Sequence, residues 1–469
     1  MATPNSKPNT TPSANHREIP VHDFFRNPDQ TRFTISPDGS QLAWLAPWKS
    51  RLNIHVTSIA QLSNGQFDGK NEALRVTSSE ARDITIYIWK NKDCILYLQD
   101  FGGDENFHLF KVDVHTGAVA DLTPFDGVKV DLVDYRYDEP DQVFIQMNKR
   151  NPELFDIYKL KISTGELALL EENPGNISSW IADHNGEIRA AITTDGTNTS
   201  LLYRAEVDQD FKTVLTTNFR DSVEPQFFTF DNKALVALSN RGRNTSSAVI
   251  LNLESGEETL LYENPEYDCM GVGYSRLRKK IISVLYVDWK LQRHIKDEQT
   301  ANWLEKLNDH LNDFHFKIES ITDDENIVIV RARSDVQPGA YYLYSIAEDQ
   351  LTFLTNVQSA HKPEELSKTQ AIEFKSRDGL KIHGYLTLPA HCEAKNLPVV
   401  VNPHGGPWYR DTWDFNPEGL FLANQGIAVL RINFRGSTGY GKAFWEASFG
   451  QWGLKMQDDI TDGVKWLID

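Results

Sequence analysis

The sequence predicts a β-propeller of about seven blades, followed by a smaller domain built on an open parallel α/β sheet. Short hairpin sequences recur at a nearly constant spacing, the recurrence stops near residue 370, and strand and helix patterns alternate beyond it. With 469 residues, of which 40% are hydrophobic and 24% charged, the chain has the length for two domains and the composition of a globular protein.

The repeated unit is an aromatic or aliphatic strand that runs into a turn and then into a second strand. Equivalent turn residues are about 48, 45, 46 and 93 residues apart, which is one period of roughly 46 residues with one copy skipped. Propeller blades have periods in this range. The regular copies begin at Leu109, Ile157, Leu202, Val249 and Tyr342.

The skipped copy has an explanation in the sequence. Trp303, Leu307 and Leu311 recur every four residues there, which predicts a short amphipathic helix inserted into that blade. A less regular copy at residues 52–77 follows a Ser-Pro-Asp-Gly turn and brings the total to about seven units. Periodicity alone does not close a ring, so an array of β-sandwich units stays open as an alternative.

After residue 370 the elements follow a different order. Residues 372–389 form two strands around an Asp-Gly turn, and the apolar run at 397–403 is typical of a strand buried on both faces. A helix capped by Gly426 comes next, then a buried strand from Ile427, and finally an amphipathic helix from Lys455. This alternation predicts an open parallel sheet.

The charge of the chain disfavours several partners. The sequence has 48 basic and 66 acidic residues, and its net charge of -18 repels nucleic acid backbones and anionic lipid surfaces. We therefore expect neither a nucleic acid nor a membrane partner. The sequence leaves the oligomeric state open.

The N-terminal residues lack an apolar stretch that could act as a secretory signal, and no later segment has the ~20 apolar residues of a membrane span. We therefore expect a cytoplasmic protein whose residues 1–18 form a disordered tail. Cys94, Cys269 and Cys392 are far apart in no paired spacing, which indicates three reduced thiols rather than a disulfide framework or a zinc site. We expect no metal and no cofactor.

The turn His-Gly-Gly-Pro at residues 404–407 is the motif that points most directly to a catalytic function. A glycine pair directly after a buried strand exposes backbone N–H groups at the carboxyl edge of the sheet, where an α/β hydrolase forms half of its oxyanion hole. Gly406 is the expected donor. The alternative is a plain tight turn ended by Pro407. A general-base role for His404 is less favoured than a hydrogen-bonded supporting role, since the sequence places no nucleophile near it.

A second glycine-rich turn, residues 436–442, matches the G-x-x-x-x-G-K part of a phosphate-binding loop. The residue after Lys442 is Ala443, not the Ser or Thr whose hydroxyl would hold magnesium. The segment therefore indicates a wide turn rather than a nucleotide site.

Two acidic groups are weaker candidates. Asp104 and Glu105 follow a Gly-Gly turn in the first regular blade, where they could meet a substrate amine, although a solvated loop is the more ordinary interpretation. Asp458, Asp459 and Asp462 are expected on or near the solvated face of the last helix, and a metal cluster there has little support beyond their proximity.

Four segments in this order carry a resemblance: the propeller repeats, the hairpin F-K-S-R-D-G-L-K-I-H-G-Y-L-T-L-P, the turn H-G-G-P and the segment F-R-G-S-T-G-Y-G. The chain resembles the prolyl oligopeptidase family of serine peptidases over residues 19–469, and it is most similar to the acylaminoacyl-peptidase and dipeptidyl-peptidase-like branch. The resemblance implies a propeller over 19–365 that filters access to a cavity, and an α/β-hydrolase domain from 366 that cleaves short peptides. It also implies that Gly406 serves the oxyanion hole.

The family's next motif would be the serine elbow G-x-S-x-G, and no such motif occurs in these residues. By the resemblance, the Ser, Asp and His of the triad lie beyond Asp469, and residues 366–469 form only the N-terminal part of the hydrolase domain. We therefore expect a C-terminally truncated peptidase that is inactive alone. The alternative function is a non-catalytic peptide-binding or scaffolding propeller with a vestigial hydrolase domain. A third interpretation, an esterase, is disfavoured by the propeller.

Overall fold

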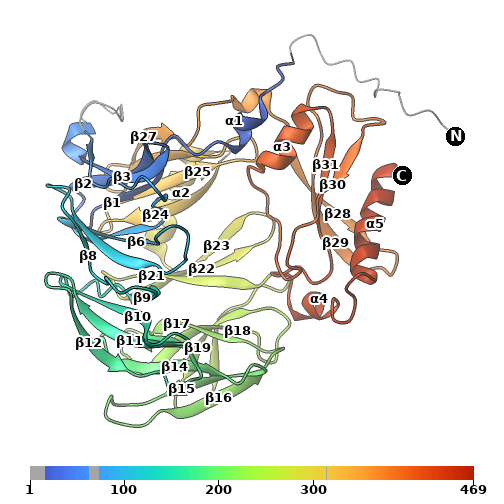
Figure 1. Cartoon of the computed structure of the whole chain (residues 1–469). Coiled ribbons are helices and arrows are strands. Elements are labelled where there is room, and N and C mark those ends of the chain that lie inside the picture. Colours follow the sequence, from blue (N-terminus) through green and yellow to red (C-terminus); the bar gives the residue numbers. More distant parts are fainter. Residues whose placement is uncertain (1–15, 63–72, 313) are drawn as a thin grey trace.

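The computed structural model describes residues 16–62, 73–312 and 314–469. Between Thr31 and Asn356 these residues form seven small antiparallel sheets that follow one another along the chain. An eighth sheet follows near the C-terminus. Figure 1 shows the seven sheets arranged around a common centre, with the eighth sheet and its helices beside them.

The first sheet consists of β1 (Thr31–Ile35), β2 (Gln41–Trp48), β3 (Arg51–Ser58) and β4 (Leu74–Arg75), with the 3-10 turn η1 (Ile59–Leu62) after β3. The second consists of β5 (Tyr87–Asn91), β6 (Cys94–Gln99), β7 (His108–Asp113) and β8 (Val119–Asp121). The third consists of β9 (Val130–Asp134), β10 (Gln142–Asn151), β11 (Leu154–Lys161) and β12 (Glu166–Glu171). The fourth consists of β13 (Ile177–Ala182), β14 (Ile188–Thr194), β15 (Asn198–Tyr203) and β16 (Lys212–Asn218).

The fifth sheet consists of β17 (Val223–Phe228), β18 (Ala234–Ser239), β19 (Ser247–Asn252) and β20 (Glu258–Tyr262). The sixth has the three strands β21 (Cys269–Ser275), β22 (Lys280–Val287) and β23 (Leu291–Ile295). The seventh consists of β24 (His315–Ile321), β25 (Ile327–Arg333), β26 (Ala340–Ser345) and β27 (Gln350–Asn356), and the 3-10 turn η2 (Pro363–Glu365) leads out of it.

The sequence repeat corresponds to one strand of each sheet. The five regular copies fall on β7, β11, β15, β19 and β26, which are the third strands of their sheets. The skipped copy falls on the sixth sheet, where the predicted helix is confirmed as α2 (Glu298–Leu311) and follows β23 in place of a fourth strand. Trp303, Leu307 and Leu311 of α2 are buried in one cluster with residues of the seventh sheet, as the four-residue spacing predicts.

The first and seventh sheets lie side by side, and this contact gives the array its propeller-like form. The amide of Ile35 donates to Ser320 Oγ at 2.9 Å, and the amide of Asp323 donates to the Pro37 carbonyl at 2.8 Å. Phe33 and Tyr341 pack together in a hydrophobic cluster to which both sheets contribute residues. Among the described residues no strand is shared between the two sheets, so side chains and turns hold this junction.

The C-terminal sheet has the order β28-β29-β31-β30 and differs from the parallel sheet that we predicted. β28 (Thr369–Lys375) and β29 (Lys381–Thr387) form the expected hairpin, and β29 pairs antiparallel with β31 (Ala428–Asn433). Only β30 (Val399–Val401) runs parallel to its neighbour, β31. The sheet is mixed because its first two strands, β28 and β29, form a hairpin, and the strands of a hairpin are antiparallel. The parallel pair, β30 and β31, is connected through helix α3.

The predicted burial of the first apolar run is also wrong. Val399 and Val400 are 42% and 37% exposed, because β30 lies at the edge of the sheet in the described residues. β31 is buried throughout, as expected for an interior strand. Helices α3 (Pro417–Asn424) and α5 (Lys455–Ile468) lie on opposite sides of this sheet, and the short α4 (Lys442–Glu446) precedes α5 (Figure 1).

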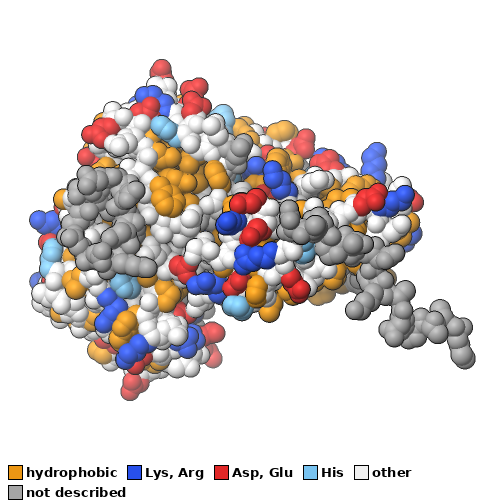
Figure 2. Space-filling view, turned by 90° about the horizontal axis from the view of Figure 1, so that it is seen from above, with side chains coloured by type: hydrophobic (Ala, Val, Ile, Leu, Met, Phe, Trp, Pro, Cys, Tyr) orange, Lys and Arg blue, Asp and Glu red, His pale blue; other side chains and the backbone are white. Residues whose placement is uncertain are grey.

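The N-terminal segment crosses to the C-terminal sheet. Helix α1 (Val21–Phe25) packs on α3, and the amide of Ile19 donates to Asn424 Oδ1 at 2.8 Å. Of the predicted disordered tail, residues 1–15 lie outside the described residues, whereas His16 contacts the Asn424 carbonyl and Arg17 pairs with Glu365. On the face shown in Figure 2, positive and negative side chains are interspersed rather than gathered in a field of one sign.

Candidate functional site

The glycine turn at residues 404–407 leaves the carboxyl end of β30 and is open to solvent. Gly406 has φ +127°, and a Cβ there would come within 2.8 Å of the Trp408 amide nitrogen, so this position requires glycine. Among the hydrogen bonds of the described residues, none uses the Gly406 amide. The turn therefore presents a backbone donor that is free to bind an oxygen atom.

His404 holds this turn in place through contacts of its ring nitrogens and its ring face. Its Nε2 lies 2.8 Å from Ser437 Oγ, its Nδ1 lies 2.8 Å from the Gly405 carbonyl oxygen, and its ring stacks on Phe434 at 4.6 Å. The Ser437 hydroxyl also lies 2.7 Å from the Phe434 carbonyl, so its one hydrogen serves only one of two acceptors. Ser437 is completely buried and does not reach a ligand. These contacts are those of a supporting histidine.

A cavity of about 680 Å³ lies beside the turn, between the fifth and sixth sheets and the C-terminal domain. Tyr409 and Arg410, which come after Trp408 at the end of the glycine turn, form part of its wall. The propeller side contributes apolar and acidic side chains, including Met270 and Glu224. The size of the cavity suits a small organic ligand or a short peptide.

The second glycine-rich turn joins the C-terminal segment to the fifth sheet and the turn before it, beside this cavity. Lys442 Nζ lies 2.7 Å from Asp221 Oδ1, between β16 and β17. Asn244, between β18 and β19, accepts from the Lys442 amide at 2.7 Å and from the Ala443 amide at 2.9 Å. The lysine of the phosphate-loop-like segment is thus used in an ion pair between domains, which agrees with the interpretation of this segment as a wide turn.

The sequence analysis did not identify two carboxyl groups that line the cavity, those of Glu224 and Asp268. Burial raises the pKa of Asp268, whose oxygens accept from the amides of Ser246 at 2.7 Å and Gly441 at 3.2 Å. Burial, and then the charge of Asp268, raises the pKa of Glu224. In the described part of the chain, the Glu224 carboxylate has no hydrogen-bond or ion-pair partner. Neither residue belongs to a sequence motif, because Glu224 lies in the fifth sheet and Asp268 directly before the sixth.

Asp104 and Glu105 lie in the exposed loop between β6 and β7. Asp104 accepts from the amide of Asn106 at 3.1 Å, and the amide of Glu105 donates to Asp100 at 3.3 Å. Asn244 of the fifth sheet occupies the same kind of loop, between second and third strands, and touches the C-terminal domain. The acidic pair therefore lies at the end of the ring that faces that domain, although it does not line the cavity described above.

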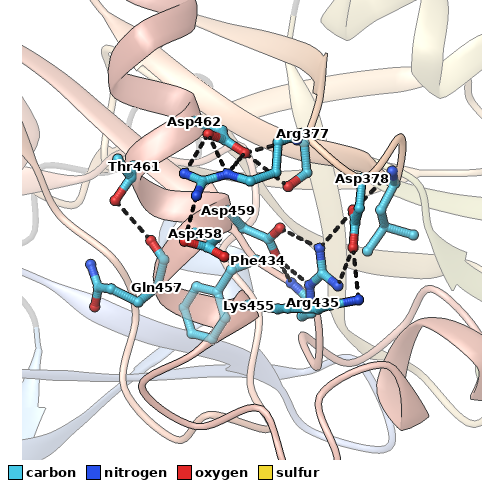
Figure 3. A network of polar contacts seen from close by, with 12 residues as sticks. Arg377, Asp378, Phe434, Arg435, Lys455, Gln457, Asp458, Asp459, Thr461 and Asp462 are labelled. Carbon is cyan, nitrogen blue, oxygen red and sulfur yellow. Dashed lines mark hydrogen bonds and ion pairs between the residues drawn. The ribbon is translucent and has the colours of Figure 1, made fainter.

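Two of the three aspartates of the last helix, Asp459 and Asp462, do not lie on its solvated face as expected. Asp459 is fully buried and Asp462 is 7% exposed, and each is held by an arginine, whereas Asp458 is 40% exposed at the side chain (Figure 3). Arg377 Nη2 lies 2.8 Å from Asp462, and hydrogen bonding to Arg377 lowers the pKa of Asp462 to about 2. Arg377 and Arg435 lie outside the helix, so the amphipathic pattern of residues 455–468 alone did not reveal these pairs.

This arrangement has a structural use. Arg435 follows β31 and Arg377 follows β28, so the carboxylates of α5 bind to the ends of two strands of the sheet. No group of three or more residues that could hold a metal ion occurs in the described ranges. None of the described helices is long and apolar enough to cross a bilayer.

The fold and the turn define a class of protein, in which a propeller-like ring of small antiparallel sheets lies beside a mixed sheet with a free backbone donor at its edge. Residues 399–469 match the family model described as the prolyl oligopeptidase family. The chain is 34% identical over 95% of its length to dipeptidyl aminopeptidase BIII of Pseudoxanthomonas mexicana and 26% identical over 96% to dipeptidyl peptidase family member 6 of Caenorhabditis elegans. It spans 65% of each relative.

Solved structures show the same fold. A puromycin-hydrolysing peptidase of Mycobacterium tuberculosis superimposes with a TM-score of 0.70 at 17% identity, covering 98% of this chain and 75% of that one. A prolyl endopeptidase gives a TM-score of 0.69 at 12% identity, covering 96% and 67%. The chain is therefore similar in sequence to the prolyl oligopeptidase family over residues 399–469 and to dipeptidyl peptidases over nearly its whole length, and it shares the fold of solved peptidases.

Proposed function

We propose that the protein to which this chain belongs hydrolyses short peptides by serine chemistry and releases one or two residues from the amino terminus. The observation that carries this proposal is the unpartnered amide of Gly406 at the exposed glycine turn beside the cavity. The names of the relatives support the peptide class, since two of them are dipeptidyl peptidases.

In this proposal the Gly406 amide donates to the carbonyl oxygen of the scissile bond and stabilises the negative charge that develops there. His404 and Ser437 hold the turn in place, so they act as positioning residues. Asp104 and Glu105, at the ring end that faces the C-terminal domain, are proposed to bind the substrate amine. The seven sheets act as blades, with the propeller over 19–365 and the hydrolase domain from 366.

The proposed chemistry also requires an attacking hydroxyl. No G-x-S-x-G motif occurs in residues 1–469, and an oxyanion hole without a nucleophile forms no acyl-enzyme. We propose that the 469-residue chain binds peptides and does not cleave them.

The experiment is to incubate the purified chain with aminoacyl- and dipeptidyl-nitroanilides and with a fluorophosphonate probe. We expect neither turnover nor labelling, whereas covalent labelling of any serine would contradict the proposed inactivity. A scaffolding function is the second candidate, favoured by the same missing motif. The coding DNA after codon 469 separates the two, because an in-frame serine elbow there supports the peptidase and an immediate stop supports the scaffold.

A further inference from the structure

The first described residues of the chain tie the ring of sheets to the C-terminal domain. Residues 16–25, here called the N-terminal strap, precede the first sheet and end in α1. Ile19 and Phe24 of the strap are buried in one hydrophobic cluster with Val336 of the seventh sheet's β25–β26 loop and Leu420 of α3. The strap therefore contacts both parts of the molecule, and Figure 1 shows α1 beside α3.

His361, in the segment between β27 and η2, contacts the strap through its ring. Its imidazole stacks on Phe24, with ring centres 5.6 Å apart, and on Phe415, just before α3, with ring centres 5.3 Å apart. Both ring nitrogens are buried, and neither has a hydrogen-bond partner among the described residues. A neutral imidazole has one N–H donor and one acceptor nitrogen, so packing alone holds this ring in place.

The charged groups nearest to His361 are paired with one another. Asp23 of α1 lies 2.9 Å from His22, and Glu365 of η2 lies 3.1 Å from Arg17 of the strap. Burial lowers the pKa of His361. The charge of Arg17 lowers it further, whereas the charges of Asp23 and Glu365 oppose this shift in part. Burial is the largest of these effects, so the buried ring favours its neutral form.

The other charged side chains on the flanking segments are engaged elsewhere or exposed. They are Lys362, Glu364, Asp414 and Glu418. Asp414 lies 3.5 Å from Arg431, and Glu418 accepts from the side chain of Asn402 at 2.9 Å. None of the described groups therefore offers an acceptor to a second N–H on the ring of His361.

A second imidazole contact holds the start of the strap. His16 stacks on His391, in the loop after β29, with ring centres 3.5 Å apart, and His16 Nε2 lies 2.9 Å from the Asn424 carbonyl oxygen. Burial, and then the charge of His16, lowers the pKa of His391. Two charged imidazoles at this distance repel one another, so this contact also favours a neutral ring.

We propose that the N-terminal strap is an acid-sensitive tie, which leaves the C-terminal domain when His361 is protonated. A protonated ring carries a charge and two N–H donors against Phe24 and Phe415, without an acceptor. The attraction of an imidazolium to phenyl rings is smaller than the hydration that a buried charge loses. Release of the strap exposes the ring to water. This inference does not depend on the proposed peptidase activity.

The direction of the pH dependence follows from the two states of the ring. In the released strap, His361 has an ordinary pKa near 6.5, and in the docked strap its pKa is lower. The released state therefore binds the proton more readily. The contact is fully formed above about pH 6.5 and weakens as the pH falls below that value.

The test is hydrogen exchange of the 469-residue chain at pH 7.5 and pH 5.5, expressed as protection factors so that the pH dependence of the chemical exchange cancels. We expect the protection of residues 19–26 to fall several-fold at pH 5.5, and by at most about tenfold from His361 alone, since one proton binds one pH unit below an ordinary pKa. The protection of β31 is expected to stay constant. His361→Phe keeps an aromatic ring without a titrating group and is expected to remove most of the change.

The matched control is His22→Gln, which removes an imidazole from α1 at a side chain that is 75% exposed, and which is expected to keep the wild-type pH dependence. His391→Phe is expected to remove the smaller remaining part of the change. If His361→Phe does not fold, His361→Leu is measured in its place. Equal protection of the strap at the two pH values in the wild-type chain, or the wild-type pH dependence in a folded His361 variant, would overturn the proposal.

Discussion

The guanidinium of Arg435 donates two hydrogen bonds to the carboxylate of Asp459, from Nε to Oδ2 at 2.8 Å and from Nη2 to Oδ1 at 2.7 Å. Both side chains are removed from solvent, at 4% and 0% exposure. Arg435 also reaches Asp378 at 2.9 Å, so one arginine joins the turn after β28, the end of β31 and helix α5 (Figure 3).

Asp459→Asn is expected to loosen α5, because it leaves the buried guanidinium of Arg435 with the partly exposed Asp378 as its remaining carboxylate partner; breaking a buried pair costs up to about 3–5 kcal/mol. Hydrogen exchange of the α5 amides measures the effect. Asp458→Asn, one position away and 40% exposed, is the matched control and is expected to cost less than about 1 kcal/mol. Equal protection in the two variants would refute the importance of the buried pair.

The docking of α5 is expected to weaken in acid. Because Arg377 lowers the pKa of Asp462 to about 2, from an ordinary value near 3.8, the unfolded state binds the proton more readily. The contribution of Asp462 is therefore present above about pH 4 and is lost as the pH falls toward 2. Melting temperatures between pH 5 and 2.5 test this, since Asp462→Asn is expected to reduce the slope. A parallel curve for the variant would contradict the assignment.

The ion pair between Lys442 and Asp221 is expected to hold the domains together rather than to stabilise either one. Its side chains are 22% and 29% exposed, and Asp221→Asn is expected to weaken the contact by about 1 kcal/mol. Faster proteolysis near α4, with unchanged unfolding of the sheets, is the expected result. Arg220→Gln, which breaks the more exposed pair with Glu446, serves as the control and is expected to have a smaller effect.

Gly463 of α5 is expected to resist replacement even though alanine favours helices by about 1 kcal/mol over glycine. An alanine Cβ would lie 2.5 Å from Ile432 Cδ1 and 3.1 Å from the Phe374 ring, and overpacking costs about 1–3 kcal/mol. Gly463→Ala is therefore expected to lower the thermal stability. Thr461→Ala, on the exposed side, is the control and is expected to be neutral or stabilising. A stabilised glycine variant would show that the core relaxes freely.

Local patterns predicted local elements well. The spacing of Trp303, Leu307 and Leu311 located α2, and the strand repeat located the third strand of five sheets, because both depend on residues near in sequence. The prediction of an all-parallel sheet and the expected solvent exposure of Asp459 and Asp462 on α5 were wrong. Both depend on partners supplied by distant segments, such as Arg377 and Arg435, which no periodicity reveals.

The sequence predicted only part of the candidate site, because some of its residues come from segments that are distant in the sequence. The sequence pointed to Gly406 through a motif, and the structure shows the conformation that requires glycine there. Glu224 and Asp268 gather only when the fifth and sixth sheets meet the C-terminal domain. Ser437 contacts His404, but in the sequence it is one of several small residues of a turn, so its role was not predicted.

The contact between Ile19 and Asn424 joins residues 405 positions apart, and it has a consequence for biosynthesis. A ribosome releases the start of the chain long before it makes helix α3, so the segment around α1 has no partner while the sheets of the ring form. The earliest described residues to leave the ribosome are thus among the last to reach their final position, and until then Phe24, which ends up buried, stays available to chaperones.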